Sequence, residues 1–338
     1  MRFYLLHLVF LCSMALTAQD ALMASKAIFE REMLEGEIVL DFPPRAPKER
    51  SQAKENARWP FQLQGGLILV EACVDDHKTP FLLDSGAPNL FINGVVDQES
   101  ANFSALGVNG SLDIAEHSVQ SFQLGNIHQR EVQAYQLDIS HLEEAKDCKM
   151  GGIIGYDQIK NHEILIDYQN EELTIVEPGN MLSRPELQVQ ECIPFSVEGH
   201  FAVIKVSIAD KQYNFGIDTG AETNVLHKKL YRKLKKRAIE STNKISIRGI
   251  DRNTSNVLKC ELKALQIADK TYENLEFVFA DLKHLNKAYG IQLHGLLGYP
   301  FLKTHLYSLN YRDGELCFWE SSSPFEFETE ITYHKDDQ

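Results

Sequence analysis

Leu83-Asp-Ser-Gly-Ala87 and Ile217-Asp-Thr-Gly-Ala221 are two copies of one short pattern: an aliphatic residue, an aspartate, a hydroxyl side chain, a glycine and an alanine. A single Asp-Ser/Thr-Gly tripeptide usually indicates only a turn. This chain of 338 residues contains two of them and no third. Each is followed downstream by two aliphatic residues and a glycine, in Ile153-Ile-Gly155 and Leu296-Leu-Gly298. The pattern therefore indicates a duplicated unit rather than two unrelated turns.

The repeat extends well beyond these stretches. Residues 59–92 align without a gap over residues 193–226, and residues 122–173 align over residues 265–316, with 21 identities in 86 aligned positions. Unrelated segments would share only a handful. The offset between the copies grows by nine along the chain, so the second copy carries about nine additional residues, which lie between Ala221 and Leu265.

Each copy has the sequence pattern of a β protein. Leu67–Val74 and Phe201–Ile208 are strand-like runs, and each is followed by a polar turn and a second apolar run that leads into the aspartate. Short helices are expected after Gly155 and Gly298. We therefore predict a mostly β fold with two pseudo-symmetric lobes.

The repeat also divides the chain into segments. We expect a signal peptide at residues 1–18, a leader, edge strand or propeptide at 19–58, an N-terminal lobe at 59–177, a linker at 178–192, a C-terminal lobe at 193–320 and a polar tail at 321–338. The linker is placed where Pro178, Gly179 and Pro185 occur together. The tail is polar and acidic, which is typical of a frayed terminus.

With its paired Asp-Ser/Thr-Gly-Ala motifs, the chain resembles the aspartic protease superfamily over both lobes. The alanine after each glycine and the short lobes look more like the retropepsin-type branch than like pepsin. Retropepsins pair two separate chains about a two-fold axis, whereas both copies here share one polypeptide. The resemblance therefore implies a single-chain pseudo-dimer of closed, barrel-like lobes with a cleft between them.

Asp84 and Asp218 are the predicted catalytic pair. Two carboxylates in contact cannot both ionise cheaply, so the pair shares a proton, a behaviour for which aspartic proteases are themselves the type case. The ionised member takes a proton from water, and the protonated member donates to the scissile carbonyl oxygen as the water attacks. This chemistry needs no cofactor, no metal and no covalent intermediate.

The neighbouring residues have supporting roles. Glycine at Gly86 and Gly220 allows a sharp turn and a close approach of the two loops. The resemblance implies that the hydroxyls of Ser85 and Thr219 cross-link those loops. The downstream glycines, Gly155 and Gly298, are expected on buried strands, where they would leave room beside the catalytic loops.

The resemblance also implies a mobile hairpin, or flap, over the cleft. Residues 247–251, with Gly249 and Ile250, are the best candidate for its tip, and residues 107–110, with Gly107 and Gly110, are the counterpart. An ordinary surface hairpin is the alternative at both places.

The first residues are typical of an export signal. Arg2 precedes an apolar stretch from Phe3 to Leu16, and small residues suitable for cleavage occur at Ala15 and Ala18. The stretch is shorter than the roughly 20 residues that span a bilayer. We therefore expect a secreted or periplasmic protein with no integral membrane span once the signal is removed, and an uncleaved signal anchor is the alternative.

The composition is that of a soluble globular protein, with 43% hydrophobic and 24% charged residues. A net charge of −14 argues against nucleic acid as a partner, because phosphate binding needs an excess of Lys and Arg. We expect a monomer that binds a protein or peptide substrate.

Cysteine and histidine do not form an obvious framework. Removal of the signal leaves an odd number of cysteines without close spacing, which predicts mostly small buried residues and leaves room for one bridge that the sequence cannot assign: Cys73, Cys148, Cys192, Cys260 and Cys317. Two histidine pairs recur in the repeat, and shared packing explains them better than a metal site does: His141/His284 and His162/His305.

One segment has the opposite charge to the rest of the chain. Seven of the ten residues from Lys228 to Arg237 are Lys or Arg. Apolar residues recur every four positions through it, which predicts an amphipathic helix with a solvated basic face: Leu226, Leu230, Leu234 and Ala238. Steering of acidic substrates or contact with an anionic surface is the alternative role.

These observations together predict an exported aspartic endopeptidase. A catalytically inactive relative that binds peptides in the same cleft is the first alternative, since a fold does not guarantee an activity. A protein that acts through its basic helix is the second. Because alanine rather than a hydroxyl residue follows each glycine, we expect a mildly acidic pH optimum.

Overall fold

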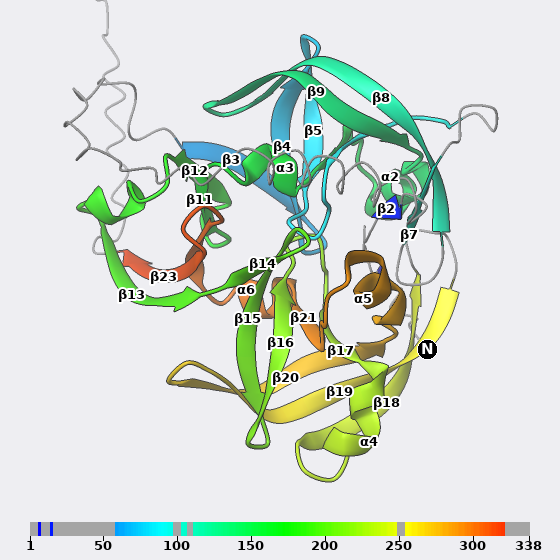
Figure 1. Ribbon diagram of the computed structural model, residues 1–338, viewed down its shortest axis with the longest axis vertical. Helices are drawn as coiled ribbons and strands as arrows, with labels where there is room; N and C mark the ends of the chain where they lie inside the picture. The colour runs from blue at the N-terminus through cyan, green and yellow to red at the C-terminus, as the bar shows by residue number, and fades with distance from the viewer. Residues whose placement is uncertain are drawn as a thin grey trace, which may run out of the picture.

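The computed structural model of the protein describes residues 6–7, 14–15, 58–96, 103–106, 111–248 and 254–321. The fold is mostly β, with two lobes that lie one above the other in Figure 1. The upper lobe in that view comes from the first copy of the repeat and the lower lobe from the second. The predicted fold class is confirmed.

Six strands of the N-terminal lobe close into a barrel. Their order is β4-β5-β10-β6-β9-β8, and β8 pairs back onto β4. β10 lies between β5 and β6, parallel to the first and antiparallel to the second. The elements of this lobe are β3 (Arg58–Gln64), β4 (Leu67–Val74), β5 (His77–Leu83), β6 (Leu90–Asn93), β7 (Phe103–Leu106), β8 (Ser111–Leu124), β9 (Ile127–Leu137), α2 (Ser140–Lys146), β10 (Gly152–Ile154) and α3 (Tyr156–Ile159).

The C-terminal lobe repeats this arrangement. Its barrel has the order β15-β16-β21-β17-β20-β19, and β19 pairs back onto β15. The elements are β14 (Ser196–Glu198), β15 (Phe201–Ile208), β16 (Lys211–Ile217), β17 (Asn224–His227), η2 (Lys228–Leu230), α4 (Tyr231–Leu234), β18 (Ile239–Arg248), β19 (Thr254–Ile267), β20 (Lys270–Ala280), α5 (Lys283–Tyr289), β21 (Gly295–Leu297) and α6 (Tyr299–Leu302). The expectation of two closed, barrel-like lobes is therefore confirmed.

Tight turns set the strands that lead to the two aspartates. Asp75–Asp76 joins β4 to β5 and Ala209–Asp210 joins β15 to β16, and all four residues have positive φ. This is the type I′ geometry, whose twist matches that of the paired strands. Because such a turn fixes the register, β5 and β16 end at equivalent positions, immediately before Asp84 and Asp218.

Each lobe has a buried core at equivalent positions. The side chains at three aligned pairs are all at most 2% exposed: Leu67/Phe201, Phe91/Val225 and Ile153/Leu296. The larger residue of the first pair belongs to one lobe and the larger residue of the second pair to the other. Such exchanges keep the total core volume similar, which a packed interior requires.

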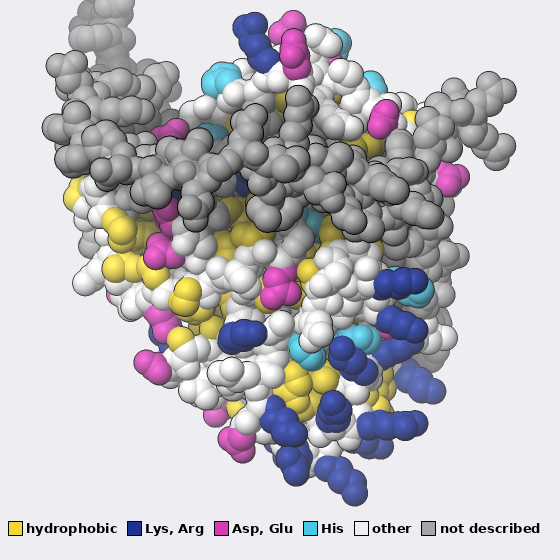
Figure 2. All heavy atoms as spheres, in the orientation of Figure 1, with side chains coloured by type: hydrophobic (Ala, Val, Ile, Leu, Met, Phe, Trp, Pro, Cys, Tyr) yellow, Lys and Arg dark blue, Asp and Glu magenta, His cyan; other side chains and the backbone are white. Residues whose placement is uncertain are grey.

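The basic segment is less helical than predicted. Only η2 and the single turn α4 are helical, and Leu226 belongs to β17 instead. Leu230, Leu234 and Ala238 are buried as the apolar spacing indicated. Figure 2 shows Lys and Arg side chains gathered over this end of the C-terminal lobe.

A six-stranded sheet joins the two lobes. Its order is β13-β23-β22-β11-β12-β3, and the pseudo-two-fold axis passes between the central strands, where the equivalent residues Leu165 and Ser308 pair with each other. The strands not yet given are β11 (Glu163–Asp167), β12 (Glu172–Val176), β13 (Leu187–Pro194), β22 (Leu306–Asn310) and β23 (Glu315–Ser321). Since each lobe contributes strands to it, this sheet fixes how the lobes face each other.

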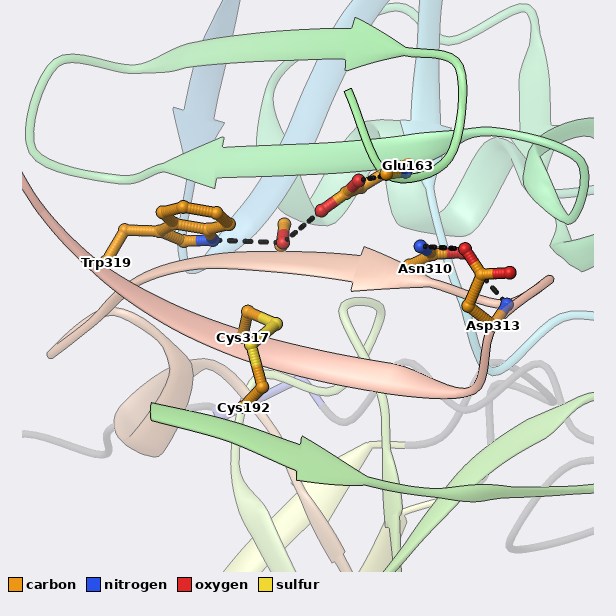
Figure 3. Close-up of a disulfide and its surroundings, with 8 residues drawn as sticks. Glu163, Cys192, Asn310, Asp313, Cys317 and Trp319 are labelled. Atoms are coloured by element: carbon orange, nitrogen blue, oxygen red, sulfur yellow. Dashed lines mark hydrogen bonds between the residues drawn. A yellow bond between two sulfur atoms is a disulfide. The ribbon is translucent and has the colours of Figure 1, made fainter. Parts of the chain in front are cut away.

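Polar bonds and a disulfide hold this sheet, as Figure 3 shows. Ser308 donates to Glu163 at 2.8 Å and accepts from the indole of Trp319 at 3.0 Å. Cys192 of β13 and Cys317 of β23 form a disulfide, which is the one bridge that the sequence left unassigned. Burial raises the pKa of the Glu163 carboxyl, and its bonds to Ser308 and to the Gly179 amide partly offset that effect.

The linker also differs from its prediction. Residues 178–186 include the short helix η1 (Met181–Ser183), but the remainder of the predicted 178–192 segment belongs to β13. Those residues pair with β23 across the sheet that joins the lobes, so the second copy is connected through a strand rather than through a free loop.

Two short strands come from the N-terminal segment. β1 (Leu6–His7) pairs with β18, and β2 (Met14–Ala15) pairs with β7. Among the described residues, no helix combines the length and the apolar character needed to cross a membrane.

Candidate active site

Asp84 and Asp218 occupy the same place in their lobes. Asp84 directly follows β5, and Asp218 directly follows β16. The backbone amide of Asp84 donates to Ile154 O at the end of β10, and that of Asp218 donates to Leu297 O at the end of β21, both at 3.0 Å. The side chains are 1% and 2% exposed. Strands β10 and β21 therefore hold the two aspartate loops at the junction of the lobes.

Reciprocal hydrogen bonds link the two loops across the pseudo-two-fold axis. The Ser85 amide donates to the Thr219 hydroxyl at 2.9 Å, and the Thr219 amide donates to the Ser85 hydroxyl at 3.0 Å. Each hydroxyl then donates across the axis to the carbonyl before the opposite aspartate, Ser85 to Ile217 at 3.2 Å and Thr219 to Leu83 at 2.9 Å. Four bonds thus fix one loop against the other, and none of them depends on solvent.

The glycines bring the carboxyl groups together. A Cβ at Gly86 would lie 2.7 Å from the carboxyl carbon of Asp218, and a Cβ at Gly220 would lie 2.2 Å from that of Asp84. Each carboxyl group therefore packs against the glycine of the opposite loop. The amides of Gly86 and Gly220 also donate to the Oδ1 atoms of Asp84 and Asp218, at 2.8 and 3.0 Å.

Gly155 and Gly298 lie one residue beyond the buried strands, not on them as the sequence suggested. They are the N-cap residues of α3 and α6, immediately before the first helical residue. Their role beside the loops is nevertheless steric: an added Cβ would lie 2.6 Å from Ala87 O in one lobe and 2.4 Å from Ala221 O in the other. The amides that follow, Tyr156 and Tyr299, bond those same carbonyls at 2.8 Å.

Burial dominates the electrostatics of the pair. Loss of solvent raises the pKa of both carboxyls, and the charge of Asp84 raises that of Asp218 further. The two carboxyls also act on each other, and this interaction couples their protonation. Two buried carboxyls in this arrangement titrate as a pair. The site can therefore present one carboxylate and one carboxylic acid to a bound molecule.

A buried ion pair between the lobes lies next to the site and has no signal in the sequence. Lys146, the last residue of α2, contacts Glu222 at 2.8 Å, and the side chains are 8% and 6% exposed. Glu222 comes directly after the motif that ends at Ala221, and burial raises its pKa to about 7 while Lys146 lowers it. In the alignment of the two copies, Lys146 corresponds to Tyr289 and Glu222 corresponds to Pro88. The ion pair therefore occurs on one side of the pseudo-two-fold axis only.

A buried histidine on the other side of the axis also escaped the sequence analysis. His200 lies in the turn between β14 and β15, is 2% exposed, and places its Nε2 atom 2.6 Å from the carbonyl oxygen of Gly86. The aligned residue of the N-terminal lobe is Gly66. The only sequence signal was this mismatch within the repeat.

The remaining predicted positions are less informative. The flap candidates Gly107, Gly110, Gly249 and Ile250 lie outside the described residues, although the strands that flank them pair as antiparallel neighbours, at Leu106↔Ser111 and Arg248↔Thr254. Across the residues that the structure describes, no three His, Cys, Asp or Glu side chains gather as a metal site would require.

Comparison with known proteins finds one family model and similar solved structures. A family model described as Aspartyl protease matches residues 70–158 and 204–301, one region in each lobe. Among solved structures, the crystal structure of basic 7S globulin from soybean is similar, with a TM-score of 0.44 and 11% identity over 79% of this chain and 94% of that one. None of the curated proteins compared by sequence matches the chain.

The two matched regions cover more than half of the chain and contain both Asp-Ser/Thr-Gly motifs. They also coincide with the two barrels whose loops carry the buried carboxyl pair. The chain therefore belongs to the aspartyl protease family.

Proposed function

We propose that the chain is an aspartic endopeptidase in which Asp84 and Asp218 hydrolyse peptide bonds of a protein or peptide substrate. The observation that carries the proposal is the pair itself: two buried carboxyls on equivalent loops, each packed against the glycine of the other loop. A family match alone would leave the activity open. The intact hydroxyl bonds of Ser85 and Thr219 support it further, because they hold the geometry that water activation needs.

The chemistry follows from the shared proton. The carboxylate removes a proton from a water molecule as the water oxygen bonds to the scissile carbonyl carbon, and the carboxylic acid protonates the carbonyl oxygen. The resulting gem-diol collapses when its C–N bond breaks. The amine nitrogen takes up the proton that the first carboxyl removed from water, and a hydroxyl of the diol returns its proton to the second carboxyl. Both carboxyls then return to their starting states, and water has been consumed once for each bond cut.

We also propose that the protein is exported and acts as a monomer. The apolar stretch after Arg2 supports export. The Cys192–Cys317 disulfide is consistent with it, since such bonds persist in oxidising compartments. Recovery of the full-length gene product from the periplasm or medium, with a new N-terminus near residue 18 by mass spectrometry, would support this, whereas an intact N-terminus in the membrane fraction would contradict it.

The activity is tested by peptide-library cleavage with the exported wild type and with Asp84→Asn and Asp218→Asn. Each substitution should lower kcat/KM by about a thousandfold or more, because neither asparagine can exchange the proton. Asp76→Asn, at an exposed turn that tolerates asparagine, is the matched control and should cleave as the wild type does. A folded Asp218→Asn variant that still cleaves would remove these residues from the mechanism.

Two further measurements separate the alternatives. Cleavage should be blocked by a peptide with a statine-type transition-state mimic, and the pH–rate profile should peak at mildly acidic pH. A maximum well below about pH 3 would contradict the raised pKa of both carboxyls. Binding of the mimic without cleavage of any library peptide would identify a non-catalytic, peptide-binding relative instead.

A further inference from the structure

The two halves of the catalytic pair have different neighbours. In each lobe a hairpin turn before the first barrel strand lies at the junction of the lobes. This turn is Gly65–Gly66, before β4, in the N-terminal lobe and Gly199–His200, before β15, in the C-terminal lobe. Gly65 and Gly66 both have positive φ, whereas only Gly199 does in the second turn. The second turn can therefore carry a side chain at the position where the first has none.

His200 reaches the catalytic loop of the opposite lobe. Its Nε2 atom lies 2.6 Å from the carbonyl oxygen of Gly86, and its ring is held between Phe201 and Tyr289, at centroid distances of 4.2 and 4.7 Å. A carbonyl oxygen only accepts hydrogen bonds, so Nε2 carries the proton and donates. The Nδ1 atom is buried with no hydrogen-bond partner among the described residues.

The imidazole stays neutral in the working range of the site. Burial lowers the pKa of His200 to about 4, while the bond to Gly86 and the charge of Asp157 act weakly in the opposite direction. The side chains that face it are Phe201 and Tyr289, and Asp157 is the acidic group that contributes to its field. The hydrogen bond to Gly86 is therefore present at mildly acidic and at neutral pH.

The bond acts on the peptide group that supports Asp84. The carbonyl of Gly86 and the amide of Ala87 are the two ends of one peptide unit. That amide bonds the Asp84 backbone carbonyl at 3.1 Å and is one of the donors that lower the pKa of the Asp84 carboxyl. Hydrogen bonds in series polarise one another, so donation by His200 into the carbonyl strengthens donation by the Ala87 amide.

The opposite loop has no equivalent donor from its hairpin turn. Gly66 has no side chain, and a Cβ there would lie 2.7 Å from the ring of Tyr299. The repeat therefore supplies an imidazole to the loop of Asp84 and excludes one from the loop of Asp218. The two loops also differ at Ser85/Thr219 and at Pro88/Glu222.

We propose that His200 is a positioning residue that holds the Gly86–Ala87 peptide unit and thereby makes Asp84 the carboxylate and Asp218 the acid of the pair. In the reaction, Asp84 takes the proton of the attacking water and Asp218 gives its proton to the carbonyl oxygen. The reaction roles rest on the proposed peptidase function, whereas the order in which the two carboxyls titrate does not.

The experiment compares three substitutions that differ in reach. His200→Gln keeps an N–H donor near the place of Nε2, His200→Asn has the same amide on a shorter side chain, and His200→Phe keeps the ring but has no donor. His305→Phe is the control, since His305 is also a partly buried histidine against a backbone carbonyl, that of Phe301, outside the catalytic loops. All four are first checked for folding by circular dichroism.

In peptide cleavage, His200→Phe and His200→Asn should lower kcat about fivefold or more with KM within about twofold, the loss expected for one hydrogen bond that acts on the reacting group. The acidic limb of kcat/KM should move up by about half a pH unit or more. His200→Gln should restore most of both, and His305→Phe should change neither. Equal losses for Gln, Asn and Phe would mean that His200 serves only as packing, and the proposal would be wrong.

A second readout needs no turnover. Titration of the aspartate side-chain ¹³C signals by NMR, assigned with Asp84→Asn and Asp218→Asn, should show Asp84 ionising first in the wild type and its apparent pKa rising in His200→Asn. If the wild type cleaves nothing but shows this order, the peptidase function fails and the role of His200 stands. If Asp218 ionises first, or if the Asp84 titration is the same in His200→Asn, the proposal is overturned whatever the activity.

Discussion

At the residue scale, the glycines of the two aspartate loops pack closely against the opposite carboxyls. Gly220 is the closer of the two, since a Cβ there would lie 2.2 to 2.4 Å from three atoms of the Asp84 carboxyl. No rotation of a buried carboxyl that is bonded to the Gly86 amide relieves such an overlap. The position of Asp84 therefore depends on the absence of a single methyl group.

Gly220→Ala should lower kcat by about a hundredfold, because a displacement of about 1 Å at a reacting group has an effect of that size. Gly290→Ala is the control: its φ of +64° makes alanine strained, but no heavy atom lies within 4 Å. That variant should lose some thermal stability and keep its kcat. Wild-type turnover by a folded Gly220→Ala protein would contradict the close approach.

The pair should also govern how stability depends on pH. Because the pKa of both carboxyls is raised in the folded protein, the folded state binds a proton that the unfolded state releases above about pH 4. The free energy of unfolding should then fall as pH rises through the folded pKa, by about 1.4 kcal/mol per pH unit for one proton. Chemical denaturation of the wild type and of Asp218→Asn from pH 5 to 8 measures this slope, which should be shallower in the variant.

A flat profile for the wild type over that range, or an equal slope in Asp218→Asn, would show that the pair holds no extra proton. Asp76→Asn again controls for a generic loss of charge, because Asp76 is exposed.

At the scale of elements, each lobe has a hairpin turn at the junction of the lobes, and the last residue of a helix packs beside that turn. Equivalent residues of the two lobes make different contacts. Helix α2 ends in Lys146, which pairs with Glu222, whereas α5 ends in Tyr289, which packs on His200. The repeat thus predicts which elements meet at the junction of the lobes, but not which side-chain contacts they form there.

Lys146→Met should destabilise the protein by about 3–5 kcal/mol at pH 8, because it leaves the Glu222 carboxylate buried without its partner. The pKa of Glu222, about 7 with Lys146 present, should rise further once the cation is removed. A raised pKa stabilises the folded state at low pH and ceases to do so as pH rises, so the loss should be smaller at pH 5.5. Urea denaturation at both pH values measures it.

The double variant Lys146→Met, Glu222→Gln should recover most of the loss at pH 8, since no buried charge is left. Lys78→Met is the matched control, because its ion pair with Glu71 is exposed and should contribute less than about 1 kcal/mol. Similar losses at Lys146 and Lys78 would contradict a buried interlobe pair.

At the scale of the whole molecule, the sheet between the lobes decides whether the two aspartates meet. The disulfide ties its edge strand β13 to β23 across 125 residues. Cys192→Ala, Cys317→Ala should lower the free energy of unfolding by about 2–4 kcal/mol in oxidising buffer, chiefly by freeing the unfolded chain. A reducing agent should lower the stability of the wild type to the same level.

Cys73→Ala serves as the control, since Cys73 is free and only partly buried. This variant keeps the disulfide, so it should be about as stable as the wild type in oxidising buffer and should lose stability on reduction as the wild type does. An unchanged wild-type midpoint under reduction would show that this bond is absent in solution or contributes nothing.

The sequence alone determined the duplication, the mostly β class, and the two aspartates at the ends of equivalent strands. These conclusions rest on short-range signals, namely apolar runs, polar turns and a motif repeated at a constant spacing, and each signal acts within a few residues. The prediction was less accurate where local pattern competes with strand pairing, as for Leu226 in β17 and for residues 187–192 in β13.

Only the tertiary structure decided which cysteines bond, that Lys146 pairs with Glu222, and that His200 bonds the loop of Asp84. His200 and Gly86 are 114 residues apart, and nothing in either local sequence refers to the other. Contacts of this kind exist because the central sheet turns one lobe against the other about the Leu165–Ser308 axis. Side chains at equivalent positions then meet different partners, since two lobes of one chain, unlike two identical chains, are free to differ in sequence.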